Sequence, residues 1–425
     1  MEKNPELTKF IFECCEEARA RLGSAEKVDD QIAMRLIIES VFDNEMSREF
    51  SHEELEMAIQ RIFLMTRRRL GILQPLIDDE EINEIMVNGP NDIFIEKNGK
   101  VTRCEMCFES VEELEEVMRA IAGQVHREIN EKNPIVDARL ADGSRVNGVY
   151  KNIAINGPIL TIRKFSEKFM RMQDLVENGT VSEVGAAMLE ELVMSGYNIF
   201  VSGGTSSGKT TLLNALAEAI PSSERVIVCE DSAELKMHYI DNIVHMECRN
   251  ANSAGLGKVS MADLIKSSLR MRPNRIIVGE VRGDEVVDML QAMNTGHDGS
   301  LSTGHANSVR GMLRRLETLY LSAMPISVEA VRQQIAEGLD ILVHIEKLED
   351  GRRRITEITE LCGYENGDFK LNVLMELRNG ELVHTGNEIV KNSKLCRPEF
   401  GYSQILEWEN EHRLFMHREE LMYAD

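Results

Sequence analysis

A glycine-rich stretch near the middle of the chain has the residue types that bind phosphate groups. Residues 203–210 fit the pattern G-x-x-x-x-G-K-[ST] without a mismatch. In this pattern the loop N–H groups turn inward around phosphate oxygens, the lysine reaches the β- and γ-phosphates, and the hydroxyl ligates Mg²⁺. Lys209 and Thr210 hold these two positions. We predict a nucleoside triphosphate site made of Gly203, Gly204, Thr205, Ser206, Ser207, Gly208, Lys209, Thr210 and Thr211.

The residues around this loop form the structural context that the pattern requires. An apolar strand is predicted over residues 197–202, and a helix over residues 211–219. A strand, a glycine loop and a helix in this order aim the partial positive charge of the helix start at the phosphates. A glycine-rich turn before an ordinary core helix is the alternative, and the agreement of pattern with context disfavours it.

Two other predicted strands end in acidic residues. Glu230, Asp231 and Glu234 follow the strand 225–229 and could order Mg²⁺ or its waters, so we predict Glu230 as a catalytic residue and, with Thr210, a metal ligand. The alternative is an acid-rich helix start. The strand 275–279 ends in Glu280, where Gly279 replaces the aspartate usual at this position. A carboxylate there can orient and polarise an attacking water.

Two histidines flank a short predicted strand within residues 296–307. His297 and His305 could sense the γ-phosphate or pass its state to a neighbour, and His305 is predicted as a catalytic residue. A structural role is the alternative for each ring. Kinases, GTPases and motor ATPases all use a phosphate loop, and the N-K-x-D motif typical of GTP specificity is absent from the sequence.

Hydrophobic periodicity divides the chain into five segments. We predict a helical segment over 1–70, an α+β domain over 71–165, a linker over 166–182, an α/β domain over 183–385 and an extension over 386–425, the last part helical. Residues 92–96 and 100–108 should pair as a hairpin around Asn98-Gly99. Alternating strands and helices in 183–361 predict a parallel sheet with an antiparallel pair at one end.

Composition narrows the class of protein. No apolar run approaches 18 residues and the first residues lack an apolar signal core, so a cytoplasmic protein is expected. The net charge of −23 disfavours a broad nucleic-acid surface. The arginine runs 67–69 and 352–354 are interpreted as solvated faces or subunit contacts. The eight cysteines are scattered, and Cys104 and Cys107 are interpreted as packed thiols rather than a zinc site.

Several motifs together resemble one family. The chain is similar to the type II/type IV secretion-system ATPases, closest to the CpaF-like branch that powers Tad/Flp pilus assembly. The resemblance covers about residues 60–385, and its pieces are residues 84–90, 137–146, 163–165, the phosphate loop, 230–231, 270–273, 279–282 and 295–300.

The resemblance implies fold, partners and further site residues. It implies a RecA-like motor domain preceded by a smaller PAS-like α+β domain, a hexameric ring, and ATP with Mg²⁺. It also implies a platform protein as partner at the inner face of the cytoplasmic membrane. The acidic charge balance, rather than the resemblance, leads us to expect no nucleic-acid partner. Arginines of the N-terminal domain are implied to reach the nucleotide, and by motif position these are Arg139, Arg145 and Arg163.

Two other functions stay open from the sequence. A nucleic-acid-translocating ATPase of the conjugation type would share the fold, although the acidic balance disfavours it. A nucleotide switch that does not hydrolyse ATP is the second, and Glu280 disfavours it.

Overall fold

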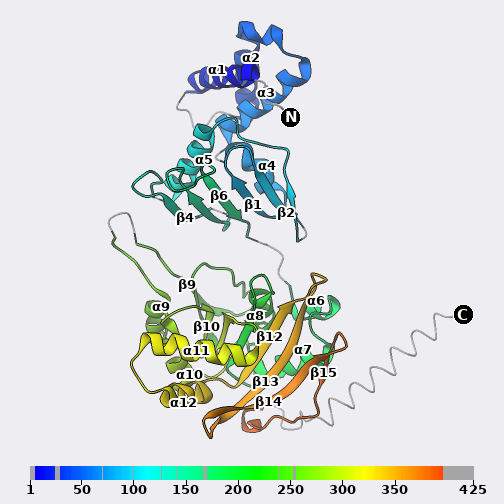
Figure 1. The fold of residues 1–425 in the computed structure, drawn as a ribbon, viewed down its shortest axis with the longest axis vertical. Helices are drawn as coiled ribbons and strands as arrows, with labels where there is room; N and C mark the ends of the chain where they lie inside the picture. The colour runs from blue at the N-terminus through cyan, green and yellow to red at the C-terminus, as the bar shows by residue number, and fades with distance from the viewer. Residues whose placement is uncertain are drawn as a thin grey trace, which may run out of the picture. The chain divides into compact units, whose positions relative to one another are not determined.

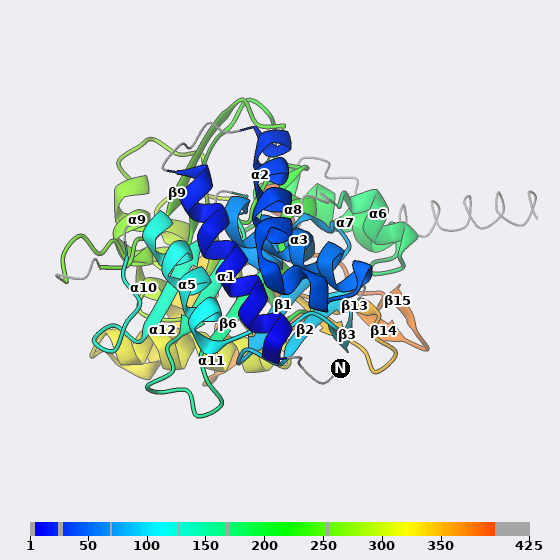
Figure 2. The same cartoon turned by 90° about the horizontal axis from the view of Figure 1, so that it is seen from above.

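The structure is a computed structural model that describes residues 5–23, 29–68, 70–97, 99–125, 127–140, 142–165, 170–237, 239–251 and 255–395. The chain divides into two compact units, residues 1–167 and 168–425 (Figure 1). Figure 2 shows the same elements turned by 90°. Each unit has its own hydrophobic core. Within the described ranges, no helix combines the length and apolar character needed to cross a membrane.

The first unit joins a helical bundle to a six-stranded antiparallel sheet of order β3-β2-β1-β6-β5-β4. Its helices are α1 Pro5–Leu22, α2 Asp30–Asp43, η1 Glu45–Glu49, α3 His52–Arg67, η2 Gly71–Leu73, α4 Gln74–Asp78 and α5 Val111–Gln124. Its strands are β1 Ile82–Asn88, β2 Ile93–Lys97, β3 Lys100–Arg103, β4 Ile135–Arg139, β5 Arg145–Val149 and β6 Ile159–Arg163.

Polar contacts join the helical bundle to the sheet part of this unit. Arg61 of α3 is 3.0 Å from Glu109 and 3.2 Å from Glu113, and it donates to the Cys107 carbonyl at 2.9 Å. Glu113 is 4% exposed, so removing the arginine would leave a buried carboxylate without its cation. Thr8 of α1 also donates to Glu109 at 2.7 Å. Residues 1–70, predicted as a segment of their own, are therefore attached to the sheet part.

The second hairpin strand is shorter than predicted. β2 and β3 pair antiparallel, but β3 ends at Arg103 rather than continuing to residue 108. The amide of Phe108 donates to the Pro90 carbonyl, and the Phe108 ring is fully buried in the core. This turn toward the core ends the alternation that suggested a longer strand.

The second unit is built on a nine-stranded sheet of order β15-β14-β13-β12-β7-β11-β10-β8-β9. β12, β7, β11, β10, β8 and β9 pair in parallel, and β12 to β15 pair antiparallel. Its strands are β7 Ile199–Gly203, β8 Arg225–Glu230, β9 Asn242–Glu247, β10 Arg275–Val281, β11 Leu301–His305, β12 Ile341–Lys347, β13 Arg353–Glu365, β14 Asp368–Arg378 and β15 Glu381–His384. Its helices are α6 Met172–Glu177, α7 Glu183–Met194, α8 Lys209–Ala217, α9 Met261–Ser268, α10 Glu285–Asn294, α11 Val309–Ala323, α12 Val328–Gly338 and η3 Asn392–Lys394.

Successive side chains of the central strands fill two separate cores. Ile199 and Val201 pack with α6, α7 and α8, whereas Phe200 packs with α9 to α12. Strands buried on both faces are apolar without a break, as parallel strands covered by helices require. The order of the sheet puts β7 between β11 and β12, so the carboxyl end of β7 lies at a topological switch point.

Part of the predicted linker belongs to the second unit. Residues 172–177 form α6, and Met172 and Leu175 are buried in the core with α7 and α8. The polar residues between them gave the stretch an irregular appearance in sequence, although two apolar side chains three residues apart suffice for one buried helical turn.

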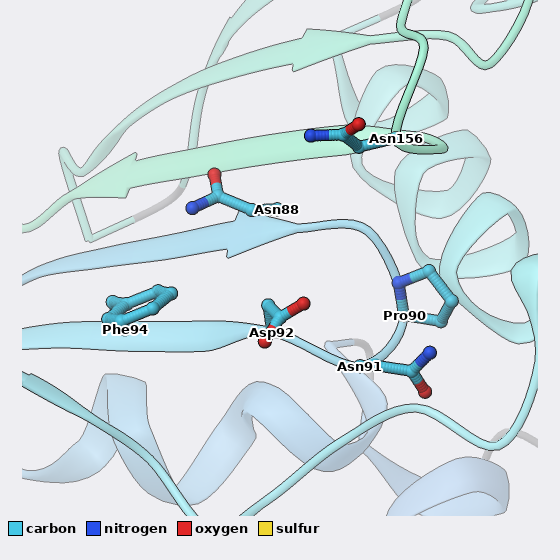
Figure 3. A pocket seen from close by; sticks show the side chains of 6 residues that line it. All are labelled: Asn88, Pro90, Asn91, Asp92, Phe94 and Asn156. Carbon is cyan, nitrogen blue, oxygen red and sulfur yellow. The ribbon is translucent and has the colours of Figure 1, made fainter.

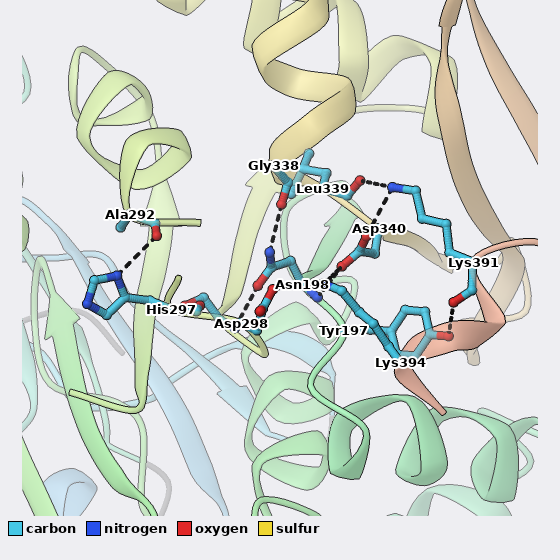
Figure 4. Close-up of polar contacts among 11 residues, drawn as sticks. Tyr197, Asn198, Ala292, His297, Asp298, Gly338, Leu339, Asp340, Lys391 and Lys394 are labelled. Atoms are coloured by element: carbon cyan, nitrogen blue, oxygen red, sulfur yellow. Dashed lines mark hydrogen bonds and ion pairs between the residues drawn. The ribbon is translucent and has the colours of Figure 1, made fainter. Parts of the chain in front are cut away.

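Residues 386–395 also belong to the second unit, beyond the predicted domain end at 385. Buried Asp340 is 3.0 Å from Lys391 and 2.9 Å from Lys394, and it accepts the Asn198 amide at 3.0 Å (Figure 4). Fully buried Glu360 accepts the amides of Val390 and Lys391. The predicted terminal helix lies outside the described residues.

Replacing Asp340 by asparagine should destabilise the second unit. The change keeps the shape of the side chain but leaves Lys391 without its carboxylate, a loss of about 1–3 kcal/mol in the free energy of unfolding. Denaturant unfolding measures it. Asp350→Asn is the matched control, because Asp350 pairs with Arg352 on an exposed turn. Equal stability of the two variants would contradict the role given to Asp340.

Candidate functional site

The phosphate loop connects buried β7 to α8 and keeps its shape through close packing at two glycines. A Cβ at Gly203 would meet the Ile345 carbonyl oxygen, and Gly208 has φ +99° beside the Arg353 side chain. Gly204 has no atom within 4 Å of a Cβ position, so the space above it is open. The loop is therefore supported from behind and accessible in front, as close approach of a phosphate requires.

Lys209 is the first residue of α8 and its side chain is folded back over the loop. Lys209 is 7% exposed, and its Nζ donates to the carbonyl oxygens of Gly204 at 2.6 Å and Gly203 at 3.2 Å. Nζ also lies 3.3 Å from Nδ1 of His305. A buried ammonium needs such acceptors, and oxygen atoms of a phosphate can replace them without loss.

The other loop residues fit a phosphate ligand as well. The Ser207 hydroxyl oxygen is buried and has no hydrogen-bond partner among the described residues. Thr205 and Ser206 are exposed, and Thr210 and Thr211 are partly exposed at the start of α8. The helix start thus presents N–H groups and hydroxyls to the same open space.

His305 links Lys209 to Glu280. β11 and β7 pair in parallel with His305 opposite Gly203, which places the ring beside the loop. An ammonium can only donate, so Nδ1 of a neutral His305 accepts from Lys209 and the ring proton lies on Nε2. Nε2 lies 2.8 Å from Oε1 of the Glu280 carboxylate, a contact at ion-pair distance without hydrogen-bond geometry. One imidazole therefore joins the phosphate-loop lysine to the strand-end glutamate.

Arg282 holds the other oxygen of Glu280. Its guanidinium donates to Oε2 of Glu280 at 2.7 Å and lies 3.6 Å from Asp231. Burial alone would raise the pKa of Glu280, but the hydrogen bond and charge of Arg282 outweigh it, so this pKa lies below its ordinary value. Arg282 was part of a sequence motif without an assigned role. Its position two residues after Glu280 was the available signal, since alternate residues share a strand face.

Gly279 leaves space for the side chain of Glu230. A Cβ at Gly279 would lie 3.0 Å from Cγ of Glu230, so an aspartate in the usual position would displace Glu230. The pairing of β10 with β11 is irregular between Val278 and Val281, which turns Glu280 toward His305. Glu230 is 3% exposed, and its Oε1 accepts the amides of Glu234 and Leu235 at 2.8 and 3.0 Å.

His297 lies at the opposite end of the strand from the phosphate loop. β11 spans Leu301–His305, so the two histidines that flank it sit at different edges of the sheet. Nδ1 of His297 is 3.2 Å from the Ala292 carbonyl at the end of α10 (Figure 4). Of the roles considered for His297, sensing the γ-phosphate at the loop of the same chain does not fit this position, because a strand of this length separates its two ends by about 13 Å.

The three predicted arginines of the first unit are neighbours across adjacent strands. Arg139 of β4 is opposite Arg145 of β5, and Arg145 is opposite Arg163 of β6. Directly opposite residues project from the same face of a sheet, and like charges placed there repel. Arg139 also donates to the Gly143 carbonyl at 3.2 Å and lies over the Phe165 ring. The structure therefore brings the three predicted arginines together at adjacent positions on one face of the sheet.

A hollow of about 300 Å³ lies elsewhere in the first unit, at the β1–β2 turn (Figure 3). It is lined by Asn88, Pro90, Asn91, Asp92, Phe94 and Asn156. None of the predicted site residues lines it, so this hollow is no part of the phosphate site.

Mg²⁺ at a nucleotide site needs few ligands from the protein itself. The described residues contain no cluster of three or more His, Cys, Asp or Glu side chains suited to a metal ion. Mg²⁺ at nucleotide sites is usually held by one or two protein oxygens together with substrate phosphates. Thr210 and Glu230 thus stay predicted ligands.

A phosphate loop at the switch point of a parallel sheet, with a glutamate on a neighbouring strand, defines a P-loop protein with a RecA-like core. In fold, the chain is similar to the crystal structure of the pilus retraction motor PilT with bound ADP, at 18% identity and a TM-score of 0.51, covering 81% of this chain and 89% of PilT.

The family follows from sequence similarity. Residues 66–363 match the family described as type II/IV secretion system protein. Conjugal transfer protein TrbB of Rhizobium radiobacter is 35% identical over 69% of this chain and 88% of its own length. Type IV secretion system protein PtlH of Bordetella pertussis is 31% identical over 68% of this chain and 93% of its own. The chain belongs to the type II/IV secretion system protein family.

The pKa of His305 should report its two partners. Burial, Lys209 and Arg282 lower this pKa below the ordinary value of 6.5, while Glu280 raises it. Lys209→Met should therefore raise the pKa of His305, and Glu280→Gln should lower it further. NMR titration of labelled histidines measures both, with His305→Gln for assignment. Identical His305 titration curves in wild type, Lys209→Met and Glu280→Gln would contradict the contacts of His305 with Lys209 and Glu280.

Proposed function

We propose that the chain is an ATPase that uses hydrolysis to drive a pilus-assembly or protein-secretion machine. The observation that supports this most is the continuous set of contacts from Lys209 through His305 to Glu280. It joins the group that holds a γ-phosphate to the group that can activate water. A nucleotide switch without hydrolysis needs the first group and not the second.

The residues of the site divide the work as follows. Phosphate oxygens replace the Gly203 and Gly204 carbonyls as acceptors for Lys209, which releases Nδ1 of His305. Nε2 of His305 stays in close contact with Glu280, 2.8 Å away, and so transmits the change to that carboxylate. Glu280, charged because its pKa lies below the ordinary range, accepts a hydrogen bond from the attacking water and orients it. Mg²⁺ bound at Thr210 and the phosphates would neutralise the developing charge.

Two substitutions test the ATPase assignment. Lys209→Ala should abolish tight ATP binding, because the phosphates lose their main cationic contact. Glu280→Gln should bind ATP and Mg²⁺ normally but hydrolyse at least about a hundredfold more slowly, because an amide keeps the shape and cannot polarise water. Binding of a fluorescent ATP analogue and phosphate release measure the two steps.

The control for Glu280→Gln is the same change at the end of a neighbouring strand. Glu346 of β12 is hydrogen-bonded to His344 and does not contact Lys209 or His305 in the described contacts. Glu346→Gln should hydrolyse ATP normally. Turnover of Glu280→Gln at the wild-type rate would remove Glu280 from the role and leave Glu230 as the next candidate.

We further propose that Arg139, Arg145 and Arg163 act on the phosphates of the nucleotide. The support is their register across β4, β5 and β6, which places three arginines at adjacent positions on one face of the sheet. A planar, permanently charged guanidinium suits phosphate oxygens that gain charge as the bond breaks. The first unit would then take part in catalysis.

Single alanine substitutions at these arginines should lower kcat about ten- to a thousandfold, the scale of one lost transition-state contact. Arg103→Ala is the matched control, since Arg103 is an exposed arginine of β3 that pairs with Asp92. An isolated second unit should likewise hydrolyse ATP poorly. Wild-type turnover in all three variants and in the isolated unit would leave the first unit as a docking module.

The machine that the ATPase serves is proposed from the family. A hexameric ring, contact with an inner-membrane platform protein and the narrower CpaF-like assignment rest on the sequence motifs. Conjugal DNA transfer is the second candidate, favoured by the name of the relative TrbB. The net charge of −23 speaks against it. Strong stimulation of hydrolysis by single-stranded DNA would favour the second candidate, whereas stimulation by a platform protein alone supports the first.

A further inference from the structure

The turn between β12 and β13 lies beside the phosphate loop. β12 pairs in parallel with β7, with Ile345 opposite Gly203. The antiparallel partner strand β13 begins at Arg353, opposite Lys347. The hairpin therefore extends past the carboxyl end of β7, where the loop begins. Arg353 is the charged residue with which this hairpin contacts the loop.

Arg353 contacts the loop at its two left-handed residues. Its Nε donates to the carbonyl oxygen of Ser206 at 3.0 Å, and Ser206 has φ +57°. Its Cδ lies 3.1 Å from the position of a Cβ at Gly208. These contacts fix the side chain against the loop, so the position of the guanidinium is defined before any ligand arrives.

No carboxylate among the described residues neutralises the charge of Arg353. Its neighbour Arg352 pairs with Asp350, and Arg354 packs on Gly179. Arg353 is exposed, and its contact to Ser206 occupies only Nε; in the part of the chain that the structure describes, no carboxylate pairs with it. Its two terminal nitrogens keep their donors for a ligand at the loop.

We propose that Arg353 is a second cationic contact for the nucleotide, binding an oxygen of its phosphate chain while it holds the Ser206 carbonyl. The inference rests on the proposed nucleotide site and adds a residue to it from outside the phosphate-loop motif. A guanidinium can serve both partners because its donors point in fixed, different directions. The ammonium of Lys209, which donates to the Gly203 and Gly204 carbonyls, supplies the first contact.

Arg353→Gln separates binding from loop support. Glutamine keeps a donor for the Ser206 carbonyl and loses the charge. With Mg²⁺ and a fluorescent ATP analogue, we expect about five- to thirtyfold weaker affinity, the range for one hydrogen bond to a charged group at an accessible site. The dependence of affinity on salt should also become shallower. Arg352→Gln removes the same charge one residue away and should bind like wild type.

The outcomes distinguish this inference from the proposed function. No binding by the wild-type chain would refute the nucleotide site itself. Normal binding by wild type, loss in Lys209→Ala, and equal affinities of Arg353→Gln and Arg352→Gln would refute the role of Arg353 alone. Thermal unfolding of each variant shows whether the fold is retained. If Arg353→Gln is unstable, Arg353→Lys replaces it, and affinity at the wild-type level would support charge as the contribution.

Discussion

The positive charge of Lys209 is the constraint on which the rest of the site depends. An ammonium that is 7% exposed needs acceptors on several sides, and it has the Gly203 and Gly204 carbonyls and Nδ1 of His305. Because the lysine can only donate, it selects the neutral ring of His305 with its proton on Nε2. The charged form of Glu280 is favoured chiefly by Arg282, which donates to its Oε2, and the charge of Lys209 also lowers the pKa of this carboxyl. The buried charge of Lys209 therefore acts on the protonation states of both His305 and Glu280.

The carboxyl edge of the sheet is shaped to bring these residues together. β7, β11 and β10 are adjacent and parallel, so the phosphate loop, His305 and Glu280 end at the same edge. Gly279 has no side chain because Glu230 occupies that space, and Arg282 returns to hold Glu280 from the outside. The amino edge has a different role: there His297 meets the end of α10, and Asp340 binds the lysines of residues 386–395. The predicted nucleotide site and the contacts that hold residues 386–395 therefore lie at opposite edges of the same sheet.

The family, the RecA-like core and the parallel sheet could be predicted from the sequence, because the phosphate loop and the apolar strands are local signals. The position of His305 beside Lys209 needed the strand order, which a single sequence does not give. His297 was misplaced because sequence proximity does not say at which end of a strand a residue lies. The alignment of Arg139, Arg145 and Arg163 depends on register among three strands. The same is true of Arg353, which reaches the loop across 147 residues of sequence. α6 and residues 386–395 were missed because their few buried side chains are separated by polar residues.

A crystal structure of the Glu280→Gln variant with ATP and Mg²⁺ tests the central role of Lys209 most directly. We expect Nζ of Lys209 to bind oxygens of the β- and γ-phosphates and to lie too far from Nδ1 of His305 for a hydrogen bond. The His305 ring should then still contact residue 280 through Nε2. Nucleotide bound away from the loop, with Lys209 still on the Gly204 carbonyl and His305, would contradict the coupling of phosphate binding to Glu280.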